Sequence, residues 1–292
     1  MGASGPSRTV RDLLGDARAA LERAGMDTPR LDAEVLLMHV LDVDRAGLYL
    51  AYQRSAGEDE TRRYLGLIAR RGAGEPVAYL TGHREFMGLD FRVDRRVLVP
   101  RPETEFLVEW ALARAQRWEG GGRVVDVGTG SGAVAVSLAR LLPASTAPLI
   151  VGCDTSLDAL RVARENASRL APGRVALVAG DLLGWCRPGL DLVLANLPYL
   201  RADQAHAGLA HEPPGALFAT GEGFDLYRRL LPQARALLGP DGALLCELDP
   251  DQRPTALALA RETFPTAHVE VRPDLAGLDR YLIVDLARTS SG

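Results

Sequence analysis

The chain has 292 residues, of which 47% are hydrophobic and 25% charged, a balance typical of a globular protein with an ample core. It contains no apolar run long enough to cross a membrane, and its first residues lack the apolar stretch of a signal peptide, so we expect a cytoplasmic protein that does not bind membranes. The net charge of −4 argues against the basic surface that most nucleic-acid-binding proteins carry.

Residues 1–73 are expected to form a small helical bundle that recognises a partner. Apolar side chains recur at helical spacing in four segments. The acidic and basic side chains of residues 1–92 nearly balance, with 13 Arg against 14 Asp and Glu, so this region is not a basic clamp for nucleic acid. The four helical segments are 7–25, 28–42, 45–52 and 58–71.

The composition changes after this bundle. Glycines, prolines and short alternating segments between residues 74 and 102 predict a hairpin linker. The run PRPETEFLVEWALARA then begins a helix, with acidic residues in its first turn as the helix dipole favours. We place the start of the larger domain at residue 103 and its end at residue 292.

This larger domain alternates strands with helices. Such alternation predicts a parallel sheet covered by helices on both faces. The last two strands are joined by a loop too short for a crossover helix, so they should be antiparallel. The predicted strands are Arg123–Val127, Pro148–Cys153, Arg174–Ala179, Leu190–Ala195, Ala243–Glu247, His268–Arg272 and Arg280–Leu286, and the predicted helices are Ser131–Leu142, Ser156–Leu170, Phe224–Leu238 and Gln252–Phe264.

The ends of the first three predicted strands carry ligand-binding residues. VVDVGTGSGA places three glycines between a strand and a helix, where the backbone can approach a ligand closely. Asp154 ends the next strand, where a carboxylate can accept both hydroxyls of a ribose, and Asp181 ends the third. Spacing alone also fits a dinucleotide fingerprint. Asp126, two residues before Gly128, would repel a pyrophosphate and suit a cationic nucleoside.

At this point the sequence resembles the class I S-adenosylmethionine-dependent methyltransferases, which have a Rossmann-like, mostly parallel sheet with an antiparallel last strand. The resemblance implies S-adenosylmethionine as the cofactor. It implies that Gly128, Thr129, Gly130, Ser131 and Gly132 hold its methionine part, Asp154 its ribose, and Asp181 with Leu182 its adenine. No metal is expected, because the three cysteines are far apart and lack metal-ligand spacing.

The fourth predicted strand ends in Asn-Leu-Pro-Tyr. The side-chain carbonyl of Asn196 and the backbone carbonyl of Leu197 are two acceptors that could bind both hydrogens of an NH₂ group. Pro198 restricts the backbone of Leu197 and fixes where its carbonyl points. Tyr199 could offer a flat face to the planar group carrying the nitrogen. The alternative is a simple strand terminator, because Asn and Pro commonly end strands.

This segment resembles the Asn-Pro-Pro-Tyr motif of methyltransferases that act on NH₂ groups of adenine, cytosine or glutamine. Nearly the whole chain, above all residues 74–105 and 211–231, resembles the release-factor glutamine methyltransferases. The resemblance implies methylation of the glutamine of the Gly-Gly-Gln motif in class-1 release factors, by a monomer that contacts the release factor through its helical domain. Within the matching segments it implicates Arg101 and Glu212, besides Asn196 to Tyr199, in substrate binding.

Two departures from that family leave alternatives open. Leu197 stands where the family usually has Pro, and Asn-Leu-Pro-Tyr is carried by the rRNA adenine dimethyltransferases. CELDPDQ, residues 246–252, also departs from the usual family sequence. An adenine-specific RNA or DNA amino-methyltransferase is therefore the alternative, and a non-catalytic release-factor-binding protein is a second.

Overall fold

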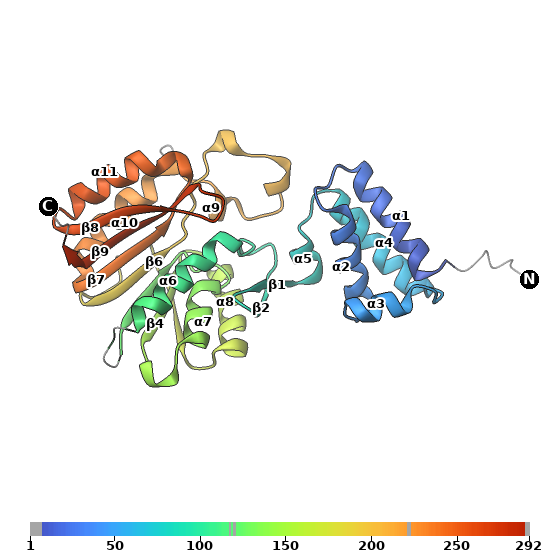
Figure 1. Cartoon of the computed structure of the whole chain (residues 1–292), viewed down its shortest axis with the longest axis horizontal. Helices are drawn as coiled ribbons and strands as arrows, with labels where there is room; N and C mark the ends of the chain where they lie inside the picture. Colours follow the sequence, from blue (N-terminus) through green and yellow to red (C-terminus); the bar gives the residue numbers. More distant parts are fainter. Residues whose placement is uncertain (1–7, 117, 119–120, 221–222, 290–292) are drawn as a thin grey trace, which may run out of the picture. The chain divides into compact units, whose positions relative to one another are not determined.

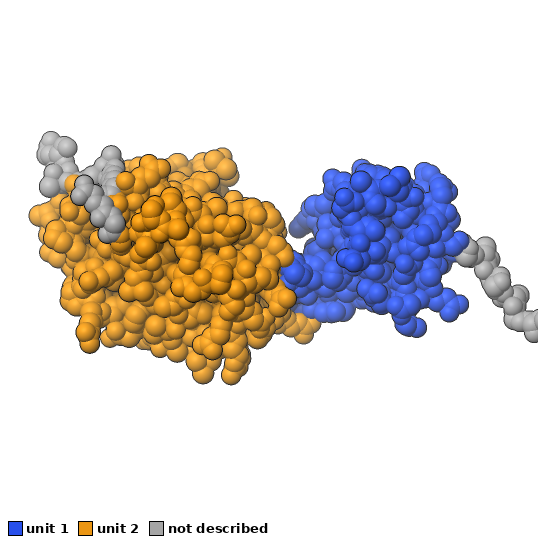
Figure 2. Space-filling view, turned by 90° about the horizontal axis from the view of Figure 1, so that it is seen from below, with its two compact units in different colours: residues 1–83, 206–211 blue, residues 84–205, 212–292 orange. Residues whose placement is uncertain are grey.

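The computed structural model describes residues 8–116, 118, 121–220 and 223–289 (Figure 1). The chain forms two compact units, residues 1–83 with 206–211 and residues 84–205 with 212–292 (Figure 2). Within the described ranges, no helix is long and apolar enough to span a membrane.

The first unit is helical, as the apolar spacing predicts. Thr9 caps the first helix: its hydroxyl accepts a hydrogen bond from Asp12 N at 3.2 Å, and the Asp12 carboxylate accepts one from Thr9 N at 3.1 Å. Tyr64 is fully buried and its hydroxyl donates to Ala33 O, which joins the fourth helix to the second. The helices are α1 (Val10–Arg23), α2 (Pro29–Leu41), α3 (Arg45–Ala51), α4 (Glu58–Gly72) and α5 (Val77–Thr81).

A short hairpin follows, formed by β1 (His83–Phe86) and β2 (Leu89–Arg92). Met87 and Gly88 connect its strands with φ values of 53° and 71°, the left-handed backbone of a tight hairpin turn. Asn166 attaches β2 to the body of the second unit, since its amide accepts from Arg92 N and donates to Arg92 O and to Ser131 O.

The second unit contains a seven-stranded sheet in the order β5-β4-β3-β6-β7-β9-β8. Strands β3 to β7 are parallel, and β9 runs antiparallel to both β7 and β8, which confirms the predicted antiparallel final pair. The strands are β3 (Arg123–Val127), β4 (Leu149–Asp154), β5 (Val175–Ala179), β6 (Leu190–Ala195), β7 (Leu238–Glu247), β8 (Ala267–Pro273) and β9 (Asp279–Thr289).

Helices cover both faces of this sheet (Figure 1). On the central strands, alternate residues such as Val125, Val193 and Leu244 belong to a buried cluster that includes Leu230 and Ala256 of the helices on one face. A buried ion pair between Arg114 and Asp285, at 3.0 Å, ties a helix of the other face to β9. The helices are α6 (Glu105–Ala115), α7 (Ala133–Leu141), α8 (Leu157–Leu170), α9 (Pro214–Leu217), α10 (Asp225–Leu237) and α11 (Arg253–Thr263).

The register of the central strands places the candidate site. Strand β3 lies between β4 and β6, so the strand order reverses at β3, where ligands bind in open α/β sheets. Val127 pairs with Cys153 on one side and with Ala195 on the other. The residues that follow in each strand or loop, Gly128, Asp154 and Asn196, are therefore brought to the same edge.

Candidate active site

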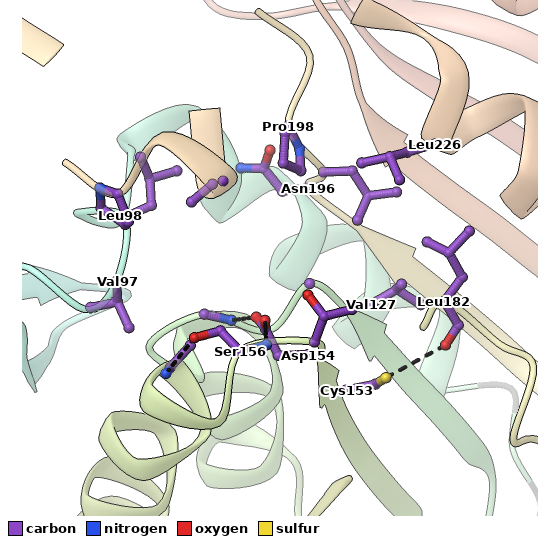
Figure 3. A pocket seen from close by; sticks show the side chains of 18 of the residues that line it. Val97, Leu98, Val127, Cys153, Asp154, Ser156, Leu182, Asn196, Pro198 and Leu226 are labelled. Carbon is purple, nitrogen blue, oxygen red and sulfur yellow. Dashed lines mark hydrogen bonds between the residues drawn. The ribbon is translucent and has the colours of Figure 1, made fainter. Parts of the chain in front are cut away.

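A pocket of about 280 Å³ opens at this carboxyl edge of the sheet (Figure 3). Asp154 and Ser156 lie on one side of it, while Asn196, Pro198 and Leu226 lie on the other (Figure 3). The predicted residues that line it are Gly128, Gly130, Asp154, Asp181, Leu182, Asn196, Leu197 and Pro198. The predicted residues that lie outside its lining are Arg101, Asp126, Thr129, Ser131, Gly132, Tyr199 and Glu212.

The glycine loop after β3 has the conformation that its sequence requires. Gly128, Gly130 and Gly132 have φ values of 73°, 54° and 81°, which favour glycine. A Cβ on Gly128 would lie 3.0 Å from Leu197 Cδ2 and 3.4 Å from Asn196 O. A side chain at Gly128 would therefore press the loop against the Asn-Leu-Pro-Tyr segment, so the loop is shaped for close approach of backbone and ligand.

Asp126 lies beneath this loop, outside the pocket lining. One of its carboxylate oxygens accepts from the Thr129 hydroxyl at 2.6 Å and from Ala135 N at 3.2 Å. Burial raises the pKa of Asp126 to about 6, against the opposing effect of these hydrogen bonds. The Asp126 side chain thus binds the loop to the start of α7. Ser131 is also buried, and its carbonyl accepts a hydrogen bond from the Asn166 side chain.

Asp154, which lines the pocket, links the glycine loop to the start of α8. Its Oδ2 accepts from Gly130 N at 3.0 Å and its Oδ1 accepts from Ser156 N at 2.8 Å. Each carboxylate oxygen can accept more than one hydrogen bond, so both remain suitable acceptors for a pair of hydroxyls. Asp181 also lines the pocket, and its carboxylate forms an exposed ion pair with Arg229.

The Asn196 amide is held on one side and open on the other. Its Nδ2 donates to Thr104 Oγ1 at 2.9 Å. No residue in the described part of the chain donates a hydrogen bond to its Oδ1. Asn196, which lines the pocket, therefore has a side-chain oxygen available as an acceptor.

Leu197 is fixed through its backbone and packs through its side chain. Its N–H donates to the Tyr227 hydroxyl at 3.3 Å, and that hydroxyl donates to Glu247 O. The side chain is buried against Gly128 and the core under α10. Leucine at this position thus fills space over the glycine loop, while the Leu197 carbonyl accepts no hydrogen bond from the described residues.

Tyr199 is not among the residues that line the pocket. Its hydroxyl donates to Glu247 Oε1 at 3.4 Å, and burial raises the pKa of this phenol. Gln252 Nε2 donates to Tyr199 O at 3.3 Å and to Gly223 O at 2.9 Å. Two residues of the unusual CELDPDQ run therefore hold the end of the Asn-Leu-Pro-Tyr segment in place.

Arg101 and Glu212 contact each other. Their ion pair spans 111 positions in the chain, and Glu212 Oε2 also accepts from Val99 N at 3.1 Å. The segments that they join supply Val97, Leu98, Pro213, Gly215 and Ala216 to the pocket lining. The pair therefore holds two pocket walls together.

Two residues to which sequence reasoning assigned no role hold the pocket residue Asn196 through hydrogen bonds. Thr104 and Glu247 are both buried, and the Thr104 hydroxyl donates to Glu247 Oε2 at 2.7 Å. Burial raises the pKa of Glu247 to about 7. Thr104 lies in the run PRPETE and Glu247 in the run CELDPDQ, and neither run reveals that the two side chains are in contact.

A sheet of this strand order and direction, with a glycine loop after β3 and acids after β4 and β5, is that of the class I S-adenosylmethionine-dependent methyltransferases. Residues 12–82 match the family described as PrmC N-terminal domain, and residues 119–247 match the methyltransferase domain family. This fold and domain imply S-adenosylmethionine as the cofactor.

The chain belongs to the family of release factor glutamine methyltransferases. It is 43% identical to the release factor glutamine methyltransferase of Deinococcus radiodurans over 94% of this chain and 97% of the relative. It is 41% identical to that of Moorella thermoacetica over 93% of this chain and 96% of the relative. Among solved structures, a methyltransferase from Pyrococcus furiosus shares the fold, with 18% identity, a TM-score of 0.52, and coverage of 80% of this chain and 100% of that one.

Proposed function

We propose that this protein transfers the methyl group of S-adenosylmethionine to the side-chain amide nitrogen of the glutamine in the Gly-Gly-Gln motif of class-1 release factors. Membership of the family supports a release-factor glutamine as the substrate, since the relatives are named release factor glutamine methyltransferases. The observation that carries the chemistry is that Asn196 and Leu197 both line the pocket, and that Asn196 Oδ1 and the Leu197 carbonyl accept no hydrogen bond from the described residues.

The pocket suits the cofactor. Its glycine backbone would receive the methionine part, Asp154 the ribose hydroxyls, and the Asp181–Leu182 segment the adenine. When bound, S-adenosylmethionine supplies an activated methyl group on a positively charged sulfur. The two acceptors would then orient the amide nitrogen of the substrate, which is a poor nucleophile because its lone pair is delocalised into the carbonyl. As positive charge develops on that nitrogen, its N–H groups would bind both acceptors more strongly, and the methylated nitrogen would then release one proton to solvent.

The helical unit is proposed to contact the release factor. Its arginines and acids nearly balance over residues 1–92, which suits a protein partner better than a nucleic acid.

The test is methyl transfer from labelled S-adenosylmethionine to a purified release factor. We expect labelling of the native factor, none of a factor whose Gly-Gly-Gln glutamine is replaced by alanine, and none with the Asn196→Ala enzyme. Transfer to RNA or DNA but not to a release factor would overturn the proposal in favour of the adenine alternative.

A further inference from the structure

The Asn196 amide belongs to a buried network with Thr104 and Glu247, named here the Thr104 network. Asn196 Nδ2 donates to Thr104 Oγ1 at 2.9 Å, and Thr104 Oγ1 donates to Glu247 Oε2 at 2.7 Å. Thr104 is 5% exposed and Glu247 is 1% exposed, so solvent has little access to replace these contacts. The network joins the turn before α6, the end of β6 and the end of β7.

The network distinguishes the two orientations of the Asn196 amide. An asparagine amide is broadly two-fold about its last torsion, so rotation exchanges its oxygen and its nitrogen. The Thr104 hydroxyl has one hydrogen. When Glu247 is ionised, its carboxylate can only accept, so the hydroxyl donates that hydrogen to Glu247 Oε2 and its oxygen can only accept from Asn196. The rotated amide would place two acceptor oxygens against each other and lose the bond.

Thr104 itself is held in place. Its N–H donates to Arg101 O at 3.1 Å, and the neighbouring Glu103 carbonyl accepts from the Tyr281 hydroxyl at 2.7 Å. Glu247 is approached by Tyr199 as well, through a 3.4 Å hydrogen bond to its other oxygen. The position of the Thr104 oxygen is thus set by the fold.

We propose that Thr104 is a positioning residue for methyl transfer, which holds the Asn196 amide in the orientation that leaves its oxygen free to accept the substrate N–H. This role rests on the proposed function, in which Asn196 binds the substrate amide. Thr104 acts through Asn196, and Glu247 acts through Thr104.

The composition of the chain allows a direct test of the amide orientation. The sequence contains two asparagines, Asn166 and Asn196, so selective labelling with ¹⁵N-asparagine reports each side-chain amide separately. Asn166 is an internal control, because its NH₂ donates to Arg92 O and Ser131 O, away from Thr104. The compared proteins are the full-length native chain, Thr104→Val, which removes the hydroxyl at similar volume, and Thr104→Ser, which keeps it.

At about pH 8, above the Glu247 pKa of about 7, we expect the Asn196 NH₂ signals of Thr104→Val to shift and broaden as the amide samples both orientations, while the Asn166 signals stay in place. Thr104→Ser should restore the native Asn196 signals. Glu247→Gln is a second variant, since its amide can donate to Thr104 and release the Thr104 hydrogen toward Asn196. Unchanged Asn196 signals in both folded variants would overturn the proposal.

The kinetic test separates positioning from binding. For Thr104→Val we expect kcat to fall roughly 10- to 100-fold, with the KM for release factor and the Kd for S-adenosylmethionine changed by less than about threefold. Thr104→Ser should recover most of the loss. A native kcat in Thr104→Val would contradict the inference alone. If the native enzyme methylated no release factor, the proposed function would fail, and the NMR measurement would still decide the orientation of the amide.

Discussion

Gly128 illustrates how one residue connects the glycine loop with the Asn-Leu-Pro-Tyr segment. We expect Gly128→Ala to lose about 1–2 kcal/mol of stability from its left-handed backbone, and to lose more because its Cβ would press on Leu197. Gly173→Ala is the matched control, because Gly173 has a φ of 72° and no atom within 4 Å of the added Cβ. Thermal unfolding measures the loss of stability, and titration with S-adenosylmethionine measures any loss of cofactor affinity. Equal losses of stability and equal cofactor affinity in the two variants would contradict the role of the close approach.

In the proposed function, ribose recognition depends on Asp154. We expect Asp154→Ala to raise the Kd for S-adenosylmethionine roughly 10- to 100-fold, since hydrogen bonds to a charged group contribute about 1.5–3 kcal/mol. Calorimetric titration measures the change, and Asp181→Asn serves as a comparison with a smaller expected effect, because the Asp181 side chain is 58% exposed. Unchanged affinity in Asp154→Ala would remove the ribose assignment.

At the scale of the elements, the Arg101–Glu212 pair joins two pocket walls. We expect Glu212→Ala to destabilise the second unit by about 1–3 kcal/mol, because it leaves Val99 N and the Arg101 guanidinium without their acceptor. Urea unfolding measures this, and faster proteolysis near Glu212 should accompany it. The exposed Arg201–Asp203 pair is the control, and Asp203→Ala should cost less than about 1 kcal/mol. Equal losses in the free energy of unfolding in the two variants would show that the Arg101–Glu212 pair does not hold the pocket walls together.

The helices and strands themselves were largely predictable from the sequence, because apolar periodicity and Gly or Pro punctuation mark them directly. The β3 range agrees residue for residue with its prediction. Strand β7 begins at Leu238, five residues before its predicted start at Ala243. The run Gly239 to Gly242 reads as a turn, yet Leu238 pairs with Leu190 of β6 with a local irregularity in register.

For the molecule as a whole, two buried acids determine a dependence of stability on pH. Burial raises the pKa of Asp126 to about 6 and that of Glu247 to about 7. At pH values between the ordinary carboxyl pKa and these raised pKa values, the folded state binds more protons than the unfolded state. The free energy of unfolding therefore falls as pH rises through this range.

We therefore expect the second unit to be less stable at about pH 8 than at about pH 5, as measured by urea unfolding across that range. This fall in the free energy of unfolding should be smaller in Glu247→Gln, whose side chain at this position cannot ionise. A flat profile in the native protein would show that neither acid is buried in its neutral form.

The sequence by itself determined the type of fold and the edge of the sheet that carries the site. Strand periodicity, glycines that need positive φ, and polar residues at strand ends are local features, and each is written in a few neighbouring residues. Those features identified Gly128, Asp154 and Asn196, which the structure brings to one pocket.

The tertiary structure alone decided which side chains contact one another across long stretches of chain. Thr104 and Glu247 are 143 positions apart, and Arg101 and Glu212 are 111 apart. It also bonded Asp126 to Thr129 of the glycine loop and Tyr199 to Glu247, both outside the pocket lining. Periodicity says which face of an element is buried but not which neighbour it meets there, because that contact depends on how the helices and strands pack.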